Sequence, residues 1–155
     1  YALNSPESPA ALVSVGSEPV DLALGDVNGD GWEDLVVVLN ETLAVSWSMD
    51  GTDFATPTYL GLTIGGAPLH PSRVDLGDAN GDGKADIAVM STQNNAVYLY
   101  FCVGNNELEG PHKFITGDKP VDMVMADLNE DGCSDIVVAG EDSKTVSVLI
   151  NEFCE

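Results

Sequence analysis

Basic residues are scarce in this chain. Only 5 of its 155 residues are lysine or arginine, against 26 aspartates and glutamates, and the formal net charge is -21. Nucleic-acid binding needs clustered lysine and arginine that neutralise phosphates, and a polybasic membrane patch needs the same residues. The composition therefore excludes both functions, and we expect no nucleic-acid partner.

Several other signals are missing as well. No run of about 18 apolar residues is present, so we expect no transmembrane segment. No segment keeps a helical period, and Gly and Asn interrupt the chain throughout, which disfavours helices. His70 and His112 stand beside prolines without a nucleophile or acid motif, so we expect no catalytic site and no enzyme.

What the chain does contain is an internal repeat. The segments Asp26–Asp34, Asp78–Asp86 and Asp127–Asp135 share the pattern D-x-N-x-D-G-x-x-D and start roughly 50 residues apart. With 44% hydrophobic residues, the chain is also apolar enough for a folded domain with a real core. The repeat, and not a single motif, must therefore set the fold.

Short β-branched runs flank each acidic segment. One run precedes it, one follows it directly, as in Ile87–Met90, and a third follows a polar turn, as in Val97–Phe101. Such short runs bounded by Asp and Gly are typical of buried strands. A period of about 50 residues with four strands predicts an all-β fold of β-propeller blades, each with four antiparallel strands.

Strand counting gives three blades' worth in one domain spanning 1–155. We expect blades at 16–64, 65–116 and 117–155, the last with only its first three strands. Residues 1–15 resemble the fourth strand of the first blade, so one blade is split between the two ends of the chain. We expect this N-terminal strand to pair with another copy, in a closed ring of two copies or a head-to-tail filament. The alternative is a fragment of a longer propeller.

The acidic segments predict three Ca²⁺ sites. Positions 1, 3, 5 and 9 supply side-chain oxygens, position 7 supplies a carbonyl, and glycine after position 5 permits the sharp turn around a hard cation. The first loop offers Asp26, Asn28, Asp30, the carbonyl of Trp32 and Asp34; the second offers Asp78, Asn80, Asp82, the carbonyl of Lys84 and Asp86; the third offers Asp127, Asn129, Asp131, the carbonyl of Cys133 and Asp135.

Two competing interpretations of these loops are weaker. An EF-hand needs an acidic residue at position 12 between helices, whereas Val37, Val89 and Val138 stand there inside predicted strands. A metal-free Asx turn fits one loop well but fits three copies in register poorly. Carboxylates gathered without a cation would have raised pKa values and would destabilise the fold.

The motif together with its flanks resembles the FG-GAP/VCBS repeat. The matching pieces are Gly25–Val37, Thr145–Leu149 and Gly51–Pro57, and the likeness covers nearly the whole chain. Such repeats form the blades of integrin α-subunit propellers and of many secreted microbial proteins. The resemblance implies a calcium-bearing β-propeller whose loops serve adhesion or partner binding. Glu130 departs from the motif, which has glycine at position 4.

The three cysteines and one glycosylation sequon indicate the cellular compartment of the protein. The ends that carry Cys133 and Cys154 fall on one face of an antiparallel sheet, so a disulfide between them is plausible, while Cys102 on that face is an alternative partner for Cys133. Asn40 begins an N-x-T sequon and is a glycosylation candidate. These features favour an extracellular, secreted or cell-surface protein.

The leading functional hypothesis is a non-enzymatic extracellular module for adhesion, protein binding or assembly. The alternative is a carbohydrate-binding lectin with a glycan or a surface protein as partner. Aromatic residues repeated at one loop position would favour it, but Trp32 is matched by Lys84 and Cys133. Trp47, Tyr98 and Tyr100 are instead expected to pack between blades.

Overall fold

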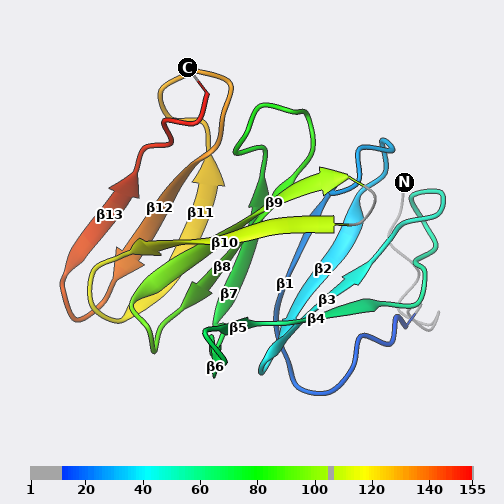
Figure 1. The fold of residues 1–155 in the computed structure, drawn as a ribbon, viewed down its shortest axis with the longest axis horizontal. Helices are drawn as coiled ribbons and strands as arrows, with labels where there is room; N and C mark the ends of the chain where they lie inside the picture. The colour runs from blue at the N-terminus through cyan, green and yellow to red at the C-terminus, as the bar shows by residue number, and fades with distance from the viewer. Residues whose placement is uncertain (1–11, 105–106, 155) are drawn as a thin grey trace, which may run out of the picture.

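The computed structural model describes residues 12–104 and 107–154, and these residues form strands joined by turns. Three antiparallel sheets stand side by side in a row (Figure 1). Within the part of the chain that the structure describes, no helix is long and apolar enough to cross a membrane.

The first two sheets have four strands each, and the third has three. The first sheet contains β1 (Pro19–Gly25), β2 (Asp34–Leu39), β3 (Thr42–Ser46) and β4 (Thr58–Gly61) in that order. The second contains β7 (Arg73–Gly77), β8 (Asp86–Ser91), β9 (Ala96–Gly104) and β10 (Glu107–Ile115). The third contains β11 (Pro120–Ala126), β12 (Asp135–Gly140) and β13 (Thr145–Leu149).

The predicted all-β fold of antiparallel four-stranded sheets is confirmed, and both complete sheets have the sequential order of a propeller blade. The predicted N-terminal strand is not seen where it can be checked. Residues 1–11 lie outside the described residues, and residues 12–15 form no strand. A strand needs a hydrogen-bonding neighbour, and β1 to β4 already pair with one another.

A two-stranded hairpin of β5 (Thr63–Ile64) and β6 (Ala67–Pro68) was not among the expected elements. Its turn is Gly65-Gly66, with φ of 58° and 84°, a conformation that favours glycine over other residues. The hairpin brings Leu62 and Leu69 into the core, where each is 1% exposed. The Gly-Gly pair between apolar residues was the sequence signal for it.

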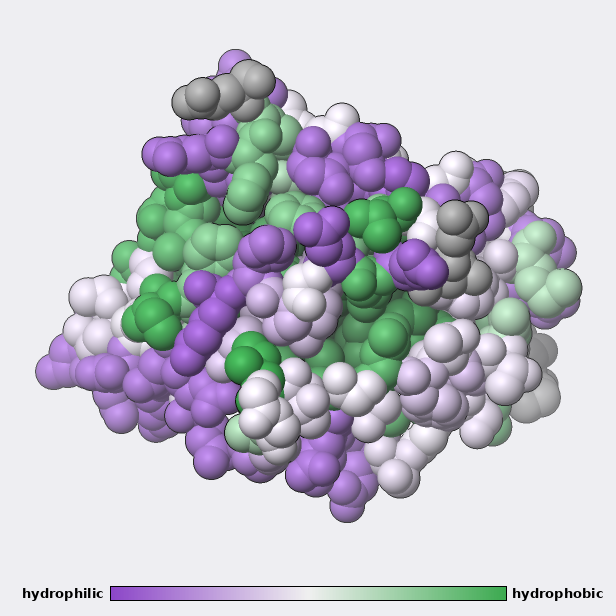
Figure 2. All heavy atoms as spheres, in the orientation of Figure 1, coloured by the Kyte–Doolittle hydropathy of each residue, from purple (hydrophilic) through white to green (hydrophobic). Residues whose placement is uncertain are grey.

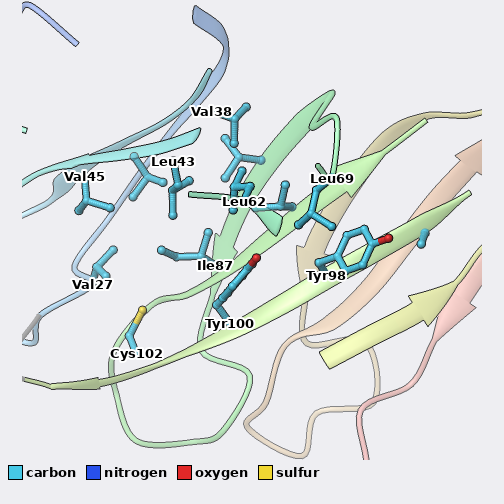
Figure 3. Packing of buried hydrophobic residues seen from close by; sticks show 14 residues of the cluster. Val27, Val38, Leu43, Val45, Leu62, Leu69, Ile87, Tyr98, Tyr100 and Cys102 are labelled. Atoms are coloured by element: carbon cyan, nitrogen blue, oxygen red, sulfur yellow. The ribbon is translucent and has the colours of Figure 1, made fainter. Parts of the chain in front are cut away.

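The core lies between the sheets. Residues alternate along each strand, so one set packs against the preceding sheet and the other set against the following sheet. At the first junction, Leu43 and Val45 of β3 face Ile87 of β8 and Tyr100 of β9 (Figure 3). Tyr98 and Tyr100 belong to this cluster with Trp47 against it, as predicted for inter-blade packing.

The second junction repeats the first with different side chains. Val97, Leu99 and Phe101 of β9 pack against Ile136 and Val138 of β12. Successive residues of β9 point to opposite junctions, so the same alternation holds here. Each sheet is therefore buried on both faces only where it has a sheet on either side.

This packing predicts a sharp difference between two isoleucines. Ile87 is 0% exposed and Ile115 is 65% exposed. We expect Ile87→Ala to lower the free energy of unfolding by about 2–5 kcal/mol through the cavity it leaves. The matched control, Ile115→Ala, should change it by less than about 0.5 kcal/mol. Urea denaturation of both variants measures this, and equal midpoints would contradict the assignment of the core.

Candidate functional site

The three acidic loops, 26–33, 78–85 and 127–134, join the first two strands of each sheet. The aspartate at position 1 organises each of them. In the first loop, Oδ1 of Asp26 accepts hydrogen bonds from the N–H of Gly29 at 2.7 Å and Asp30 at 3.0 Å, and Oδ2 accepts one from Gly31 at 2.8 Å. Asp78 and Asp127 accept bonds from the same three loop positions. Each loop thus curls around one carboxylate.

Positions 3 and 5 continue this curl. The side-chain oxygen of Asn28 accepts from the N–H of Asp30, and Asp30 in turn accepts from the N–H of Trp32. The second and third loops repeat both bonds. In the second loop, Lys84 also pairs with Asp82, at 2.5 Å. Burial works against the charge of Asp82, but the hydrogen bonds from Lys84 prevail and lower the pKa of that carboxyl.

The aspartate at position 9 behaves differently, because it is buried. Asp34, Asp86 and Asp135 are each 0% exposed. Asp86 Oδ2 accepts from the N–H of Ala79 at 2.9 Å, and its Oδ1 accepts from the N–H of Cys102 at 2.8 Å. Its counterparts accept from position 2 of their own loop and from the residue at the same place after the third strand. We call this paired contact the aspartate clamp.

Burial changes the acidity of two of these carboxyls, Asp34 and Asp86. The pKa of Asp86 is raised to about 6, first by burial and then by the nearby charges of Asp82 and Asp78, against the opposing effect of its two N–H donors. Burial also raises the pKa of Asp34, again against two N–H donors. At Asp34 and Asp86 the effect of burial on the carboxylate therefore outweighs that of its backbone donors.

Backbone hydrogen bonds connect neighbouring loops. The N–H of Ala85, at position 8 of the second loop, donates to the carbonyl of Asp26 at 2.8 Å. The N–H of Ser134, at position 8 of the third loop, donates to the carbonyl of Asp78 at 2.6 Å. These loop-to-loop bonds were missed by sequence reasoning, since a backbone donor has no residue signature. They make the three loops one continuous structure.

Position 4 lies where one loop meets the next. A Cβ at Gly29 would lie 3.2 Å from the Lys84 side chain, and one at Gly81 would lie 3.3 Å from the sulfur of Cys133. All three position-4 residues have positive φ: 80° for Gly29, 73° for Gly81 and 63° for Glu130. The departure at Glu130 therefore places a larger residue in a conformation that favours glycine.

The donor set fits a hard cation. Every candidate ligand is an oxygen. At position 1 the Oδ2 atom, which accepts one hydrogen bond where Oδ1 accepts two, still has a lone pair for a metal. Among residues 12–104 and 107–154, however, no three acidic, histidine or cysteine side chains converge into a metal cluster. The predicted ligand sets also include Asn28, Asn80 and Asn129 and the position-7 carbonyls, and they stay predictions.

The disulfide prediction is confirmed for one pair. Cys133 and Cys154 are bonded, with a Cα–Cα distance of 6.1 Å. The bond ties position 7 of the third loop to the segment after β13. The alternative partner was wrong: Cys102 is a free, buried cysteine. Its position at the end of β9 turns its side chain into the core beside Val27 (Figure 3), away from the other two.

The side chains of three other residues singled out from the sequence, Trp32, Asn40 and His112, lie outside the hydrogen-bonded interior of the acidic loops. The Trp32 side chain is 48% exposed, but its ring lies over Gly51, where a Cβ would be 2.6 Å from the ring. Asn40 is exposed in the turn between β2 and β3, and its glycosylation stays a prediction. His112 packs among Phe101 and Phe153, at centroid distances of 5.1 and 6.1 Å.

Comparisons with known proteins agree with this architecture. The model of the FG-GAP-like repeat matches residues 26–89 and 78–138. Integrin alpha-3 from Cricetulus griseus is 32% identical over 111 residues, covering 63% of this chain and 11% of the integrin. The Mus musculus protein is also 32% identical and is covered to 10%. The chain thus spans about a tenth of the length of these relatives.

Solved structures extend the likeness to the fold. A crystal structure of TcdB2-TccC3 without its hypervariable C-terminal region aligns with a TM-score of 0.61 at 19% identity, over 84% of this chain and 6% of that one. A TcdB2-TccC3-Cdc42 structure aligns with a TM-score of 0.56 at 20% identity, over 75% and 6%. At these identities the likeness concerns the fold alone.

Sheets of four antiparallel strands with acidic loops between their first two strands define a β-propeller module of the integrin-like class. Because the repeat model matches most of its length, the chain belongs to the FG-GAP-like repeat family. The resemblance of the acidic motifs to this family is therefore confirmed.

The aspartate clamp predicts a stability role that needs no metal. Asp86→Ala leaves the N–H groups of Ala79 and Cys102 without their acceptors. We expect the free energy of unfolding, measured by urea denaturation in EDTA, to fall by about 2–3 kcal/mol. Asp53→Ala, at an exposed aspartate, is the control. An unchanged midpoint for Asp86→Ala in EDTA would show that the clamp does not stabilise the fold.

Cys102 gives a second prediction. Burial raises the pKa of its thiol to about 12, and the charges of Asp86 and Asp82 add to the effect. A thiol kept protonated and out of solvent reacts slowly. We expect a thiol reagent to label no cysteine in the native protein and one after unfolding without reductant. Labelling of Cys133 or Cys154 under those conditions would contradict the disulfide.

Proposed function

We propose that the chain is an extracellular Ca²⁺-binding β-propeller module for adhesion, protein binding or assembly, with one cation in each acidic loop. The observation that carries the proposal is the threefold identity of the loops, in which the same positions curl around the same aspartate. FG-GAP repeats commonly bind Ca²⁺, and this chain belongs to that family.

The charges of the loops support a cation. The nine loop aspartates at positions 1, 5 and 9 are a large share of the 26 acidic residues. Repulsion within the second loop acts at position 9, where burial and then the nearby Asp82 and Asp78 raise the pKa of Asp86. A divalent cation would offset both the burial of this carboxylate and the repulsion from its neighbours, because it favours the charged form of every carboxylate around it.

The proposal makes the module a binding protein and not an enzyme. His112 lies among aromatic rings, and Cys102 is buried. A lectin is supported less well. The ring of Trp32 covers Gly51, and the equivalent positions carry Lys84, which pairs with Asp82, and Cys133, which is in a disulfide. No repeated aromatic platform for sugars is formed at this position.

The extracellular assignment rests on two observations. A disulfide persists in oxidising compartments and is rare in reducing ones, and Cys133–Cys154 is such a bond. The matched relatives are integrin chains. Millimolar Ca²⁺ outside cells would also suit loops of the weak extracellular kind, with dissociation constants of about 0.1–1 mM.

Calcium removal tests the proposal. At about 1 mM Ca²⁺ and a dissociation constant of ~0.1 mM, each site adds about 1.4 kcal/mol, so three sites add about 4 kcal/mol. We expect EDTA to lower the melting temperature by roughly 8–16 °C. Mg²⁺ should restore it poorly, because it demands stricter octahedral geometry. A melting temperature unchanged by EDTA would defeat the proposal.

The number of bound ions gives the matched control. Elemental analysis of the dialysed protein should find three Ca²⁺ per chain, and Asp82→Ala should reduce this to two. Asp53→Ala, an exposed aspartate outside the loops, should keep three. If Asp82→Ala retained all of its calcium, the second loop would not be a site.

A further inference from the structure

The side chain at position 7 differs among the three acidic loops. A cation would use only the carbonyl of this residue, so its side chain is free to act otherwise. The ring of Trp32 lies over Gly51, and the sulfur of Cys133 is in a disulfide. The Nζ of Lys84 instead donates to Oδ2 of Asp82, at position 5 of the same loop, at a distance of 2.5 Å. Of the three side chains, only that of Lys84 brings a positive charge to its own loop.

The oxygen that Lys84 contacts belongs to a predicted cation ligand. The other oxygen of Asp82, Oδ1, already accepts from the N–H of Lys84. In the first loop, the neutral amide of Asn28 donates to Oδ2 of Asp30 at 3.0 Å, and the third loop repeats this contact at 2.7 Å. The second loop thus has an ammonium against the oxygen that receives a neutral donor in the other two. The ammonium marks a place that favours a cation.

The stem of Lys84 holds the ammonium near this oxygen. A Cβ added to Gly29 of the first loop would lie 3.2 Å from Cγ and 3.3 Å from Cδ of Lys84. The side chain of Lys84 is 24% exposed, and that of Asp82 is 33% exposed. Because the stem rests on the neighbouring loop, less side-chain entropy opposes the ion pair than at a fully exposed site.

The other ion pairs lie elsewhere. Within residues 12–104 and 107–154, Arg73 pairs with Asp122, and Lys119 pairs with Glu141 and Asp142. None of these three carboxylates belongs to an acidic loop. Hydrophilic atoms line much of the upper edge of the molecule, where Figure 1 places the loops (Figure 2). In the described part of the chain, the second loop is therefore the one acidic loop with an ion pair.

We propose that the ammonium of Lys84 competes with Ca²⁺ for Asp82, so that the second loop is the weakest of the three calcium sites and the first to empty as Ca²⁺ falls. The proposal rests on the proposed function, because it ranks the sites assigned there. An incoming Ca²⁺ must displace the ammonium and then lie close to its charge. The lost ion pair and the remaining repulsion together correspond to roughly three- to tenfold in affinity.

The place of the second loop gives this ranking a consequence. The N–H of Ala85 binds the carbonyl of Asp26 in the first loop, and the carbonyl of Asp78 accepts from Ser134 in the third. The loop that empties first is thus the one joined to both others. Loss of one ion would loosen the middle of the loop edge at Ca²⁺ concentrations that still fill the outer two loops.

Equilibrium dialysis of the whole chain, with bound ions counted across a range of free Ca²⁺, tests the proposal. Lys84→Met keeps the stem that lies on Gly29 and removes the charge. We expect the last ion to bind this variant at roughly three- to tenfold lower free Ca²⁺ than it binds the wild type. An unchanged concentration for the last ion would overturn the proposal.

The matched control is Lys144→Met. Lys144 is exposed in the turn between β12 and β13, at the opposite end of β12 from the third acidic loop. Its substitution removes the same charge and should leave the binding curve unchanged. Equal shifts in the two variants would show that net charge alone sets the affinity, and the competition at Asp82 would be wrong.

A double variant assigns the effect to one loop. Asp82→Ala should abolish the last ion to bind and keep the first two. Adding Lys84→Met to this variant should then shift neither remaining ion. If the double variant still bound more tightly, the ammonium would act on the first loop, against which its stem lies, and the assignment to the second loop would fail. Circular dichroism checks that each variant is folded.

The same measurements separate this proposal from calcium binding itself. A protein that binds three ions, with no change in Lys84→Met, overturns the competition and leaves the calcium sites standing. A protein that binds no ion at about 1 mM Ca²⁺, within the range of extracellular sites, defeats the proposed function, and the competition fails with it.

Discussion

The fold depends on one contact made three times, the buried aspartate at position 9 with its two backbone donors. Asp86 joins the start of its loop, through Ala79, to the end of β9, through Cys102. One side chain thus fixes where the second strand begins relative to both of its neighbours. Because a one-residue slip turns every side chain to the opposite face, the clamp also decides which residues enter which junction. The apolar packing between sheets is specific only in the register that the clamp sets.

The clamp links the loops to the core, and the loops are linked to one another. The carbonyl of Asp26 accepts from Ala85, so the residue whose carboxylate organises one loop is bonded to the next. A cation that orders one loop would therefore also help to order the next loop, because a single backbone hydrogen bond joins the two. Near the third loop, Asn151 reaches the carbonyls of Ala79 and Ser134, and the Cys133–Cys154 disulfide holds the same segment. Backbone hydrogen bonds, the Asn151 side chain and the disulfide thus hold the loop edge together.

Much of this was accessible from the sequence because it repeats. The three D-x-N-x-D-G-x-x-D segments fixed the strand order of two sheets, and the antiparallel arrangement placed Cys133 near Cys154. What could not be predicted depends on neighbours in space. Cys102 was a candidate partner for Cys133 because both lie toward the same edge, yet its side chain turns into the first junction beside Val27. Residues 12–15 have the composition of a strand, but pairing requires a free edge, which no sequence pattern supplies.

The uneven charge of the chain follows from this construction. Carboxylates are gathered in the loops and at position 9, while the strand residues that meet between sheets are almost entirely apolar. Repulsion among the carboxylates is therefore strongest at the loop edge of the sheets and weak in the apolar junctions. Salt screens that repulsion within about 10 Å at 0.1 M, and cations held in the loops would reduce it further. The net charge thus bears on the stability of the loops more than on the packing between sheets.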